Sequence, residues 1–183
     1  MLDDGIDKPG HSLRTLVHMG LNGIPTEAVY KLIEDKDAIV RTLAAQRLQL
    51  DAESAERTFE VAEDLTKTNS SQLREVGAYI LGQLVPPDYP YKRPSIPILE
   101  SLISDPDRDV RATAICGLGH LGSNSSKEKI LAAVRDADFE VAEAIAFALY
   151  CFTASEKEKT IVRAHAKRFR TSDRKAIETW LDP

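Results

Sequence analysis

Apolar residues recur at intervals of three and four positions in five segments of the chain, as at Val29, Leu32 and Ile33. This spacing places them on one face of an α-helix. It predicts helices over residues 26–34, 55–65, 96–103, 127–134 and 157–169. A second helix is expected after each of these. In three copies its start is marked by an aspartate, which can accept hydrogen bonds from the free N–H groups of the first turn. These residues are Asp37, Asp107 and Asp138.

The second helices repeat one sequence pattern. The matching segments are residues 37–45, 72–78, 107–115 and 138–146. Their equivalent positions are Arg41, Arg74, Arg111 and Ala142, and a degenerate fifth copy surrounds Arg174. The first four copies are 33, 37 and 31 residues apart. Such steps fit a unit of two helices and two short turns, which needs about 30–40 residues.

A helical pair of this kind cannot bury its apolar stripe alone, so successive pairs must stack on one another. The repeat therefore predicts an all-α fold, an α-solenoid of four to five helical hairpins in a single domain over residues 1–183. Its predicted parts are an N-terminal cap over 1–24, the repeats over 25–152 and a C-terminal capping repeat over 153–183.

Alignment of the copies also predicts the core. Three apolar positions of each second helix are expected to be buried: Val40, Leu73, Val110 and Val141; Leu43, Val76, Thr113 and Ala144; Leu48, Leu81, Leu118 and Leu149. One further position holds only small residues, which would let neighbouring helices approach closely: Ala44, Gly77 and Ala114.

The repeated pattern Asp-x-Asp-x-Val-Arg-x-x-Ala with a trailing Leu-Gly resembles HEAT or HEAT-like repeats over about residues 25–152, most closely over 105–122. In that family, Asp–Arg pairs form a ladder between successive turns. The resemblance implies that Arg41, Arg74 and Arg111 pair with the three aspartates Asp37, Asp107 and Asp138. The ladder is expected to end before the last copy, which has Ala142 in place of the arginine.

A narrower resemblance rests on residues 72–84, 110–115 and 47–50. These segments are similar to small bacterial HEAT-repeat proteins encoded beside Rhs-type polymorphic toxins, which are thought to act as immunity proteins. Some of those proteins carry a lyase label taken from phycobilin lyases with similar repeats.

Composition narrows the classes of partner. The 183 residues include 24 lysines and arginines against 29 aspartates and glutamates, a net charge of −5. This balance disfavours nucleic-acid binding, which needs a basic surface. No segment approaches the ~20 apolar residues of a membrane span, and residues 1–9 are too acidic for a signal peptide. Two cysteines cannot form a disulfide framework and are expected to be free thiols. A cytoplasmic protein that binds no membrane is predicted.

The C-terminal part of the chain departs from this acidic average. Residues 153–183 carry 8 basic and 5 acidic groups, with a basic cluster over 163–170. A nucleic-acid patch is one interpretation of this cluster. The solvated face of a capping helix is favoured, because a terminal repeat needs a polar outer side.

Residues 85–95 contain four prolines. They are predicted to exclude a helix and to hold an extended segment. The segment presents Tyr89, Tyr91, Lys92 and Arg93. It is either a rigid linker whose tyrosines pack on the solenoid edge or a binding loop, because Tyr and Arg are common anchors of interfaces.

The second helices line the concave side of such a solenoid. Projection of these helices places Tyr79, Phe147 and Tyr150 in a row of otherwise small residues, with Glu75 and Glu143 beside them. The aromatic residues either fill space between repeats or act as desolvated anchors for a protein partner.

Candidate catalytic chemistry is sparse. Cys116 and His120 lie four residues apart on one helix, but a metal would need at least two further ligands at compatible spacing. No phosphate-binding loop or nucleophile motif is present. No catalytic, cofactor-binding or metal-binding residue is therefore predicted, and the protein is not expected to be an enzyme.

The favoured hypothesis is a non-catalytic protein-binding solenoid, monomeric when free. In its most specific form it is an immunity protein that neutralises a toxin with a basic surface. Alternatives are a lyase-like or DNA-glycosylase-like enzyme, or a general scaffold or adaptor. The glycosylase is disfavoured because the exposed Glu75 and Glu143 would repel phosphates. In addition, the single tryptophan, Trp180, lies far along the chain from that surface.

Overall fold

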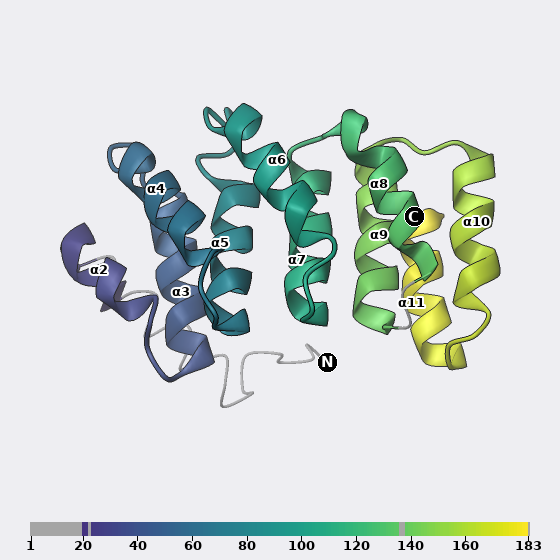
Figure 1. Ribbon diagram of the computed structural model, residues 1–183, viewed down its shortest axis with the longest axis horizontal. Coiled ribbons are helices and arrows are strands. Elements are labelled where there is room, and N and C mark those ends of the chain that lie inside the picture. The colour runs from purple at the N-terminus through teal and green to yellow at the C-terminus, as the bar shows by residue number, and fades with distance from the viewer. Residues whose placement is uncertain (1–19, 22, 136–137, 183) are drawn as a thin grey trace, which may run out of the picture.

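The computed structural model describes residues 20–21, 23–135 and 138–182, and in these ranges all regular structure is helical. The α-helices are α2 (Thr26–Leu32), α3 (Ala38–Gln49), α4 (Ala55–Leu65), α5 (Ser71–Gln83), α6 (Lys92–Leu102), α7 (Arg108–His120), α8 (Lys127–Ala132), α9 (Phe139–Cys151), α10 (Glu156–Ala166) and α11 (Thr171–Leu181) (Figure 1). Short 3-10 turns, Asn124–Ser126 and Ala133–Arg135, flank α8. Most of the predicted N-terminal cap over 1–24 lies outside the described residues.

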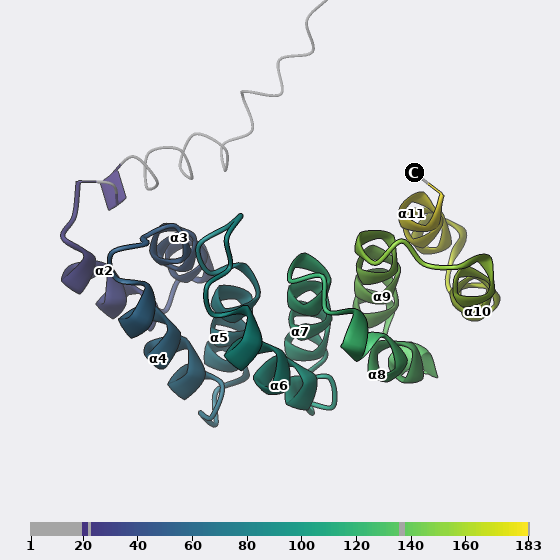
Figure 2. The same ribbon diagram turned by 90° about the horizontal axis from the view of Figure 1, so that it is seen from above.

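The helices form two curved layers, as the view from above shows (Figure 2). The outer, convex layer contains α4, α6, α8 and α10, and the inner layer contains α3, α5, α7, α9 and α11. Each inner helix packs beside the next one along the chain. This arrangement confirms the predicted all-α solenoid of stacked hairpins. No helix of the described residues has the length and apolar character needed to cross a bilayer.

Two of the three predicted aspartate caps form a hydrogen bond with the first turn of their helix. The carboxylate of Asp37 accepts a hydrogen bond from the N–H of Ile39 at 2.7 Å, and Asp107 caps α7 in the same way. Asp138 occupies the cap position of α9 without a side-chain cap hydrogen bond. Its carboxylate instead accepts a hydrogen bond from Arg111 at 2.8 Å. Asp138 therefore stands at the predicted cap position, but the predicted hydrogen bond from its side chain to the first turn does not form.

Most of the predicted core is buried, including Leu48, Leu81, Leu118 and Leu149 at the centre of the inner layer. Three predicted positions, Val40, Leu73 and Thr113, are only half-buried. Thr113 lines an open groove on the concave side, which the alignment of copies did not reveal. Val40 lies in the first described hairpin of the inner layer, which has a described neighbour on one side only, and Leu73 packs against the core in part.

Glycine sets the distance between helices at two contacts. A Cβ on Gly77 would lie 2.6 Å from the carbonyl oxygen of Ala62 on α4. A Cβ on Gly82 would lie 2.4 Å from the Cα of Gly117, so α5 and α7 touch through their backbones. The Gly77 contact agrees with the small residues at the shared position, where no larger side chain fits between α5 and α4. The contact between Gly82 and Gly117 lies outside that position and was not predicted.

We expect Gly82→Ala to lower the free energy of unfolding by about 1–3 kcal/mol, because the added methyl group forces α5 and α7 apart. Urea denaturation followed by far-ultraviolet circular dichroism measures this change. Gly23→Ala is the control, since its nearest neighbouring atom would lie 3.6 Å away. Equal midpoints for the two variants would contradict the close contact.

A ladder of arginines joins the turns of successive repeats. Arg41, Arg74 and Arg111 each donate from one guanidinium nitrogen to two carbonyls of their own turn. Arg74 also donates to both carboxylate oxygens of Asp105 in the next repeat, at 2.7 and 2.8 Å. Arg111 likewise reaches Asp138, and the ladder ends there, as Ala142 predicts.

The predicted partners were wrong at two of the three rungs. Asp105, two residues before Asp107, pairs with Arg74, whereas the carboxylate of Asp107 caps its own helix. Arg41 is buried and forms no ion pair with a carboxylate among the described residues, and Asp37 caps its own helix. The partner of Arg74, Asp105, lies six residues before Arg111, the arginine of the next repeat. The equivalent partner for Arg41 would lie six residues before Arg74. That residue is Thr68, which has no charge.

We expect Thr68→Asp to supply the missing rung and to stabilise the protein by about 0.5–1 kcal/mol at pH 7. The gain should disappear below about pH 3, where an aspartate with an ordinary pKa is protonated. Thermal unfolding at both pH values measures it. Thr68→Asn is the control of equal size, and an equal effect of both substitutions would show that no ion pair had formed.

The proline-rich segment contains helix, contrary to the prediction over 85–95. α6 begins at Lys92 and continues through Pro94 and Pro97. Pro94 lies in the first turn, where a missing N–H has no helical acceptor to lose. Before the helix, the N–H of Val85 donates to the carbonyl of Gln49 at 2.8 Å, so the loop is tied to α3.

Candidate functional site

A groove with a volume of about 490 Å³ lies on the concave side between α5, α7, α9 and α11. These helices run in the same direction, so equivalent residues line up across the groove. Its acidic end lies beside the N-terminal halves of the helices and is formed by Glu75, Asp109, Glu140 and Glu143. Its other end lies beside the C-terminal halves and is formed by Tyr79, Gln83, His120, Phe147 and Trp180.

Aromatic rings form a connected cluster at this second end. The ring of Phe147 meets that of Trp180 edge to face, with ring centroids 4.9 Å apart. The centroid of the His120 ring also lies 4.9 Å from that of Phe147. Tyr150 packs on Trp180 at 5.8 Å and remains 48% exposed at the rim. Trp180 was missed as a site residue because distance along the chain was taken as distance in space. Packing of α11 on α9 brings it into the groove.

Two carboxylates of the groove have no cationic partner among the described residues. Glu75 and Glu143 are half-buried and form no ion pair there, whereas Asp109 and Glu140 both lie 3.6 Å from Arg108. Burial raises the pKa of Glu75, and the nearby negative charges of Asp109 and Asp107 raise it further. Burial also raises the pKa of Glu143, with Glu140 adding to the effect.

A smaller hollow of about 210 Å³ adjoins the groove between α3 and α5 and shares Glu75 and Tyr79 with it. Arg41 lines this hollow and acts on Glu75 in the opposite direction, lowering its pKa. The net effect on Glu75 is still a rise. The concave face is therefore acidic over α5, α7 and α9, and the positive charge of Arg41 on α3 lies beside it.

The thiol of Cys116 lies on the floor of the groove and is not poised for nucleophilic chemistry. Burial, followed by the charge of Glu143, raises its pKa to about 12, so the thiol stays protonated at neutral pH. Burial also lowers the pKa of His120, which favours the neutral imidazole. Among residues 20–21, 23–135 and 138–182, no three His, Cys, Asp or Glu side chains are grouped as a metal site would require.

The structure divides the predicted protein-binding residues into two groups. Glu75, Tyr79, Glu143 and Phe147 line the groove, and Tyr150 stands at its rim. The residues of the proline-rich segment do not line it: Tyr89, Tyr91, Lys92 and Arg93.

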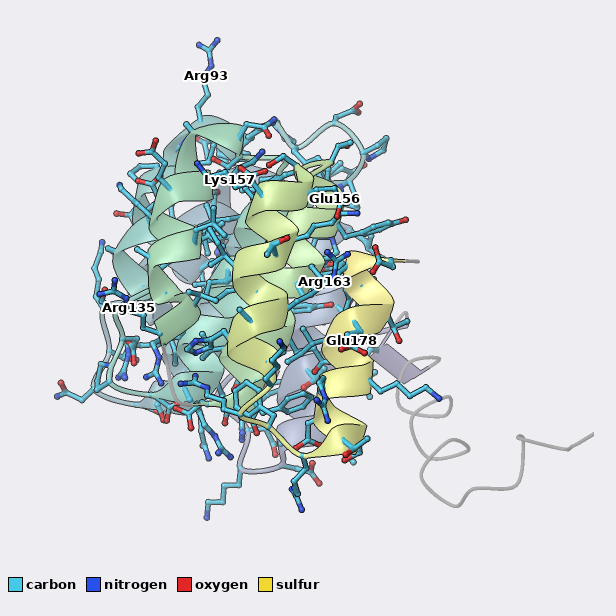
Figure 3. All side chains as sticks on the ribbon, turned by 90° about the vertical axis from the view of Figure 1, so that its right-hand side faces the viewer. Arg93, Arg135, Glu156, Lys157, Arg163 and Glu178 are labelled. Atoms are coloured by element: carbon cyan, nitrogen blue, oxygen red, sulfur yellow. The ribbon has the colours of Figure 1, made fainter. Side chains whose placement is uncertain are left out.

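In that second group, Tyr91 stacks on Phe59 of α4, with ring centroids 5.0 Å apart. Arg93 points away from the solenoid (Figure 3). The packing of Tyr91 agrees with the linker interpretation of the segment. The exposed Arg93 agrees with the alternative interpretation, a binding loop.

Ion pairs hold part of the basic C-terminal cluster. Arg163 on α10 donates to both carboxylate oxygens of Asp182 at 2.7 and 2.8 Å and to Glu156 at 3.2 Å (Figure 3). Its charge therefore joins α10 to the end of α11. This arrangement fits the interpretation of residues 163–170 as part of a capping repeat.

Comparison with known proteins gives the family. The sequence profile of HEAT repeats matches residues 60–150 and 94–179, which together span well over half of the chain. This chain belongs to the HEAT-repeat family. HEAT repeats form extended concave surfaces typical of protein-interaction scaffolds. No curated protein matches the chain.

The Escherichia coli protein YibA, solved by X-ray crystallography, has a similar structure. The TM-score is 0.71 at 20% sequence identity, over 95% of this chain and 61% of YibA. This HEAT-repeat chain thus spans less than two thirds of that protein, and the likeness concerns the fold alone.

The groove carboxylates should weaken the fold at neutral pH. A carboxyl group with a raised pKa holds its proton more tightly in the folded than in the unfolded chain. Stability therefore falls as the pH rises from the unfolded pKa, about 4.5 for Glu75, through the higher folded value. Glu75→Gln and Glu143→Gln remove this cost.

We expect each substitution to raise the melting temperature at pH 7 on the order of 1–2 °C. The difference from the unchanged protein should vanish below about pH 4, where the carboxyl groups are protonated in both states. Calorimetry across this range measures it. Glu60→Gln, at an exposed position of α4, is the matched control and should change nothing. Destabilisation by Glu75→Gln at pH 7 would show that the carboxylate has a partner.

Proposed function

We propose that this HEAT-repeat protein acts without catalysis, by binding another protein in its concave groove. The observation that carries the proposal is that two carboxylates without an ion pair among the described residues, Glu75 and Glu143, share the groove with an aromatic cluster around Phe147 and Trp180. The raised pKa values of these carboxylates predict that they destabilise the free protein at neutral pH, and a cationic partner would relieve that cost. Large aromatic side chains in a desolvated groove are typical anchors of protein interfaces.

The rigidity of the solenoid supports binding of this kind. The inner helices are fixed by backbone contacts and the arginine ladder, so the groove exists before a partner arrives. A preformed surface loses little conformational entropy on binding. The negative field of the groove would also speed the encounter with a basic protein.

In its most specific form, the proposal is an immunity protein that covers the active site or substrate surface of a bacterial toxin. An acidic groove suits a basic toxin surface, and the resemblance of residues 72–84 and 110–115 to toxin-associated HEAT proteins points the same way. A monomeric cytoplasmic protein would meet such a toxin as a one-to-one complex.

A general scaffold or adaptor is the second candidate, supported by the HEAT fold itself. Neighbouring genes distinguish the two, because an immunity gene is expected directly beside a large toxin gene. A DNA-glycosylase-like activity is disfavoured, because four carboxylates line the groove and would repel phosphates. A lyase-like activity is supported by the fold alone.

The test is capture of the partner from the source organism, followed by measurement of its affinity for groove variants. Tyr79→Ala and Phe147→Ala should each weaken binding by about 2 kcal/mol or more, because each removes an aromatic anchor. Ile161→Ala is the control, since this exposed apolar residue lies on α10 in the outer layer. Melting temperatures of all variants separate lost contacts from lost folding.

Co-expression of a captured toxin with this protein should restore growth, and the groove variants should restore it less. Unchanged affinity in both groove variants would contradict a concave binding site. If Arg93→Ala or Tyr89→Ala weakened binding instead, the interface would lie at the edge formed by residues 85–93.

A further inference from the structure

The inner helices repeat one arrangement on the two sides of the groove. Glu75 and Tyr79 lie one turn apart on α5, and Glu143 and Phe147 occupy the same two register positions on α9. On α7, between them, these positions hold the small residues Ala112 and Cys116. The groove therefore has two walls, each with a carboxylate and an aromatic ring, and a floor of small side chains.

We infer that this groove takes one arginine side chain of the partner protein, with the guanidinium between Glu75 and Glu143 and over the floor at Ala112. The inference rests on the proposed function and names the chemistry that the groove recognises. An apolar residue next to that arginine in the partner packs on Phe147 and Trp180.

Charge complementarity identifies a cation as the occupant. Four carboxylates line the groove. The described cations near them are Arg108, which lies between Asp109 and Glu140, and Arg41, which lines the adjoining hollow and forms no ion pair with Glu75. Glu75 and Glu143 are left without an ion pair among the described residues, one on each wall. A cation entering between the walls is attracted by both, and half-burial of the two carboxylates strengthens the attraction.

The aromatic rings select guanidinium over ammonium. A guanidinium is planar, stacks on aromatic faces and is weakly hydrated, so it loses less on entering a half-buried apolar groove. It can also donate in the plane to two carboxylates on opposite sides. The ammonium of lysine is a compact, strongly hydrated charge and lacks the planar face that Tyr79 and Phe147 would contact.

The single tryptophan provides a direct measurement, because Trp180 lines the groove and is the only one in the chain. The probes are three ten-residue glycine–serine peptides with blocked ends and a leucine next to one test residue, which is arginine, lysine or the uncharged citrulline. Each is titrated into the full chain up to millimolar concentration while the tryptophan fluorescence is recorded.

The arginine peptide should saturate with a Kd at least about 10-fold lower than the citrulline peptide, with lysine between them. Glu75→Gln and Glu143→Gln should each weaken arginine binding about fivefold or more and leave the citrulline peptide unchanged. Glu60→Gln on α4 should alter neither. Ala112→Phe, which fills the floor, should abolish the arginine response, and the melting temperature of each variant verifies folding.

Equal binding of arginine and citrulline, no binding of arginine, or insensitivity to both glutamine variants would overturn the inference. Equal binding of lysine and arginine would overturn the selection of guanidinium. A captured partner whose affinity still depends on Tyr79 and Phe147 would then leave the proposed function standing. Conversely, a partner insensitive to the groove variants would refute the proposed function even if the arginine peptide bound.

Discussion

The backbones of α5 and α7 meet at Gly82 and Gly117, where one added carbon on Gly82 would overlap the facing chain. A similar approach of α7 to α9 occurs at Gly119, whose Cβ would lie 3.0 Å from the Cα of Ala148. These contacts fix the spacing of the inner layer. At these points no side chain can separate the helices.

The groove is a consequence of that spacing. With α5, α7 and α9 held side by side in parallel, residues at equal register positions form rows across the concave face. One row alternates Glu75, Ala112 and Glu143, and the row one turn later alternates Tyr79, Cys116 and Phe147. Walls and floor follow from which repeats carry large side chains at these two positions.

Carboxylates gather at the turns between repeats and in the concave groove, and the two places differ in how the carboxylates are paired with arginines. At the turns, Asp105 and Asp138 are paired with arginines of the preceding repeat, and the geometry is that of a structural ladder. In the groove, Glu75 and Glu143 are half-buried with no ion pair among the described residues. Stability alone gives no reason for such carboxylates, whereas the proposed binding of a cationic partner does.

The sequence by itself determined the repeat, its register and therefore the architecture, because helical period and repeat length leave stacked hairpins as the way to bury the apolar stripes. Register alone also placed Glu75, Tyr79, Glu143 and Phe147 on one face. Tertiary structure decided which residues of different helices contact one another, which the repeat register does not specify. It placed Asp105, in place of Asp107, opposite Arg74 in the ladder, while the carboxylate of Asp107 accepts hydrogen bonds from the first turn of α7.

Tertiary structure also brought Trp180 to Phe147 through the packing of α11 on α9. It began a helix at Lys92 within a proline-rich segment, because a first turn does not need the N–H that Pro94 lacks. The helix start depends on the local position of Pro94 in the first turn. The contacts of Asp105 with Arg74 and of Trp180 with Phe147 join residues from different elements. Only the packed chain brings such residues together, because the local pattern shows to which helix a residue belongs and not what that helix packs against.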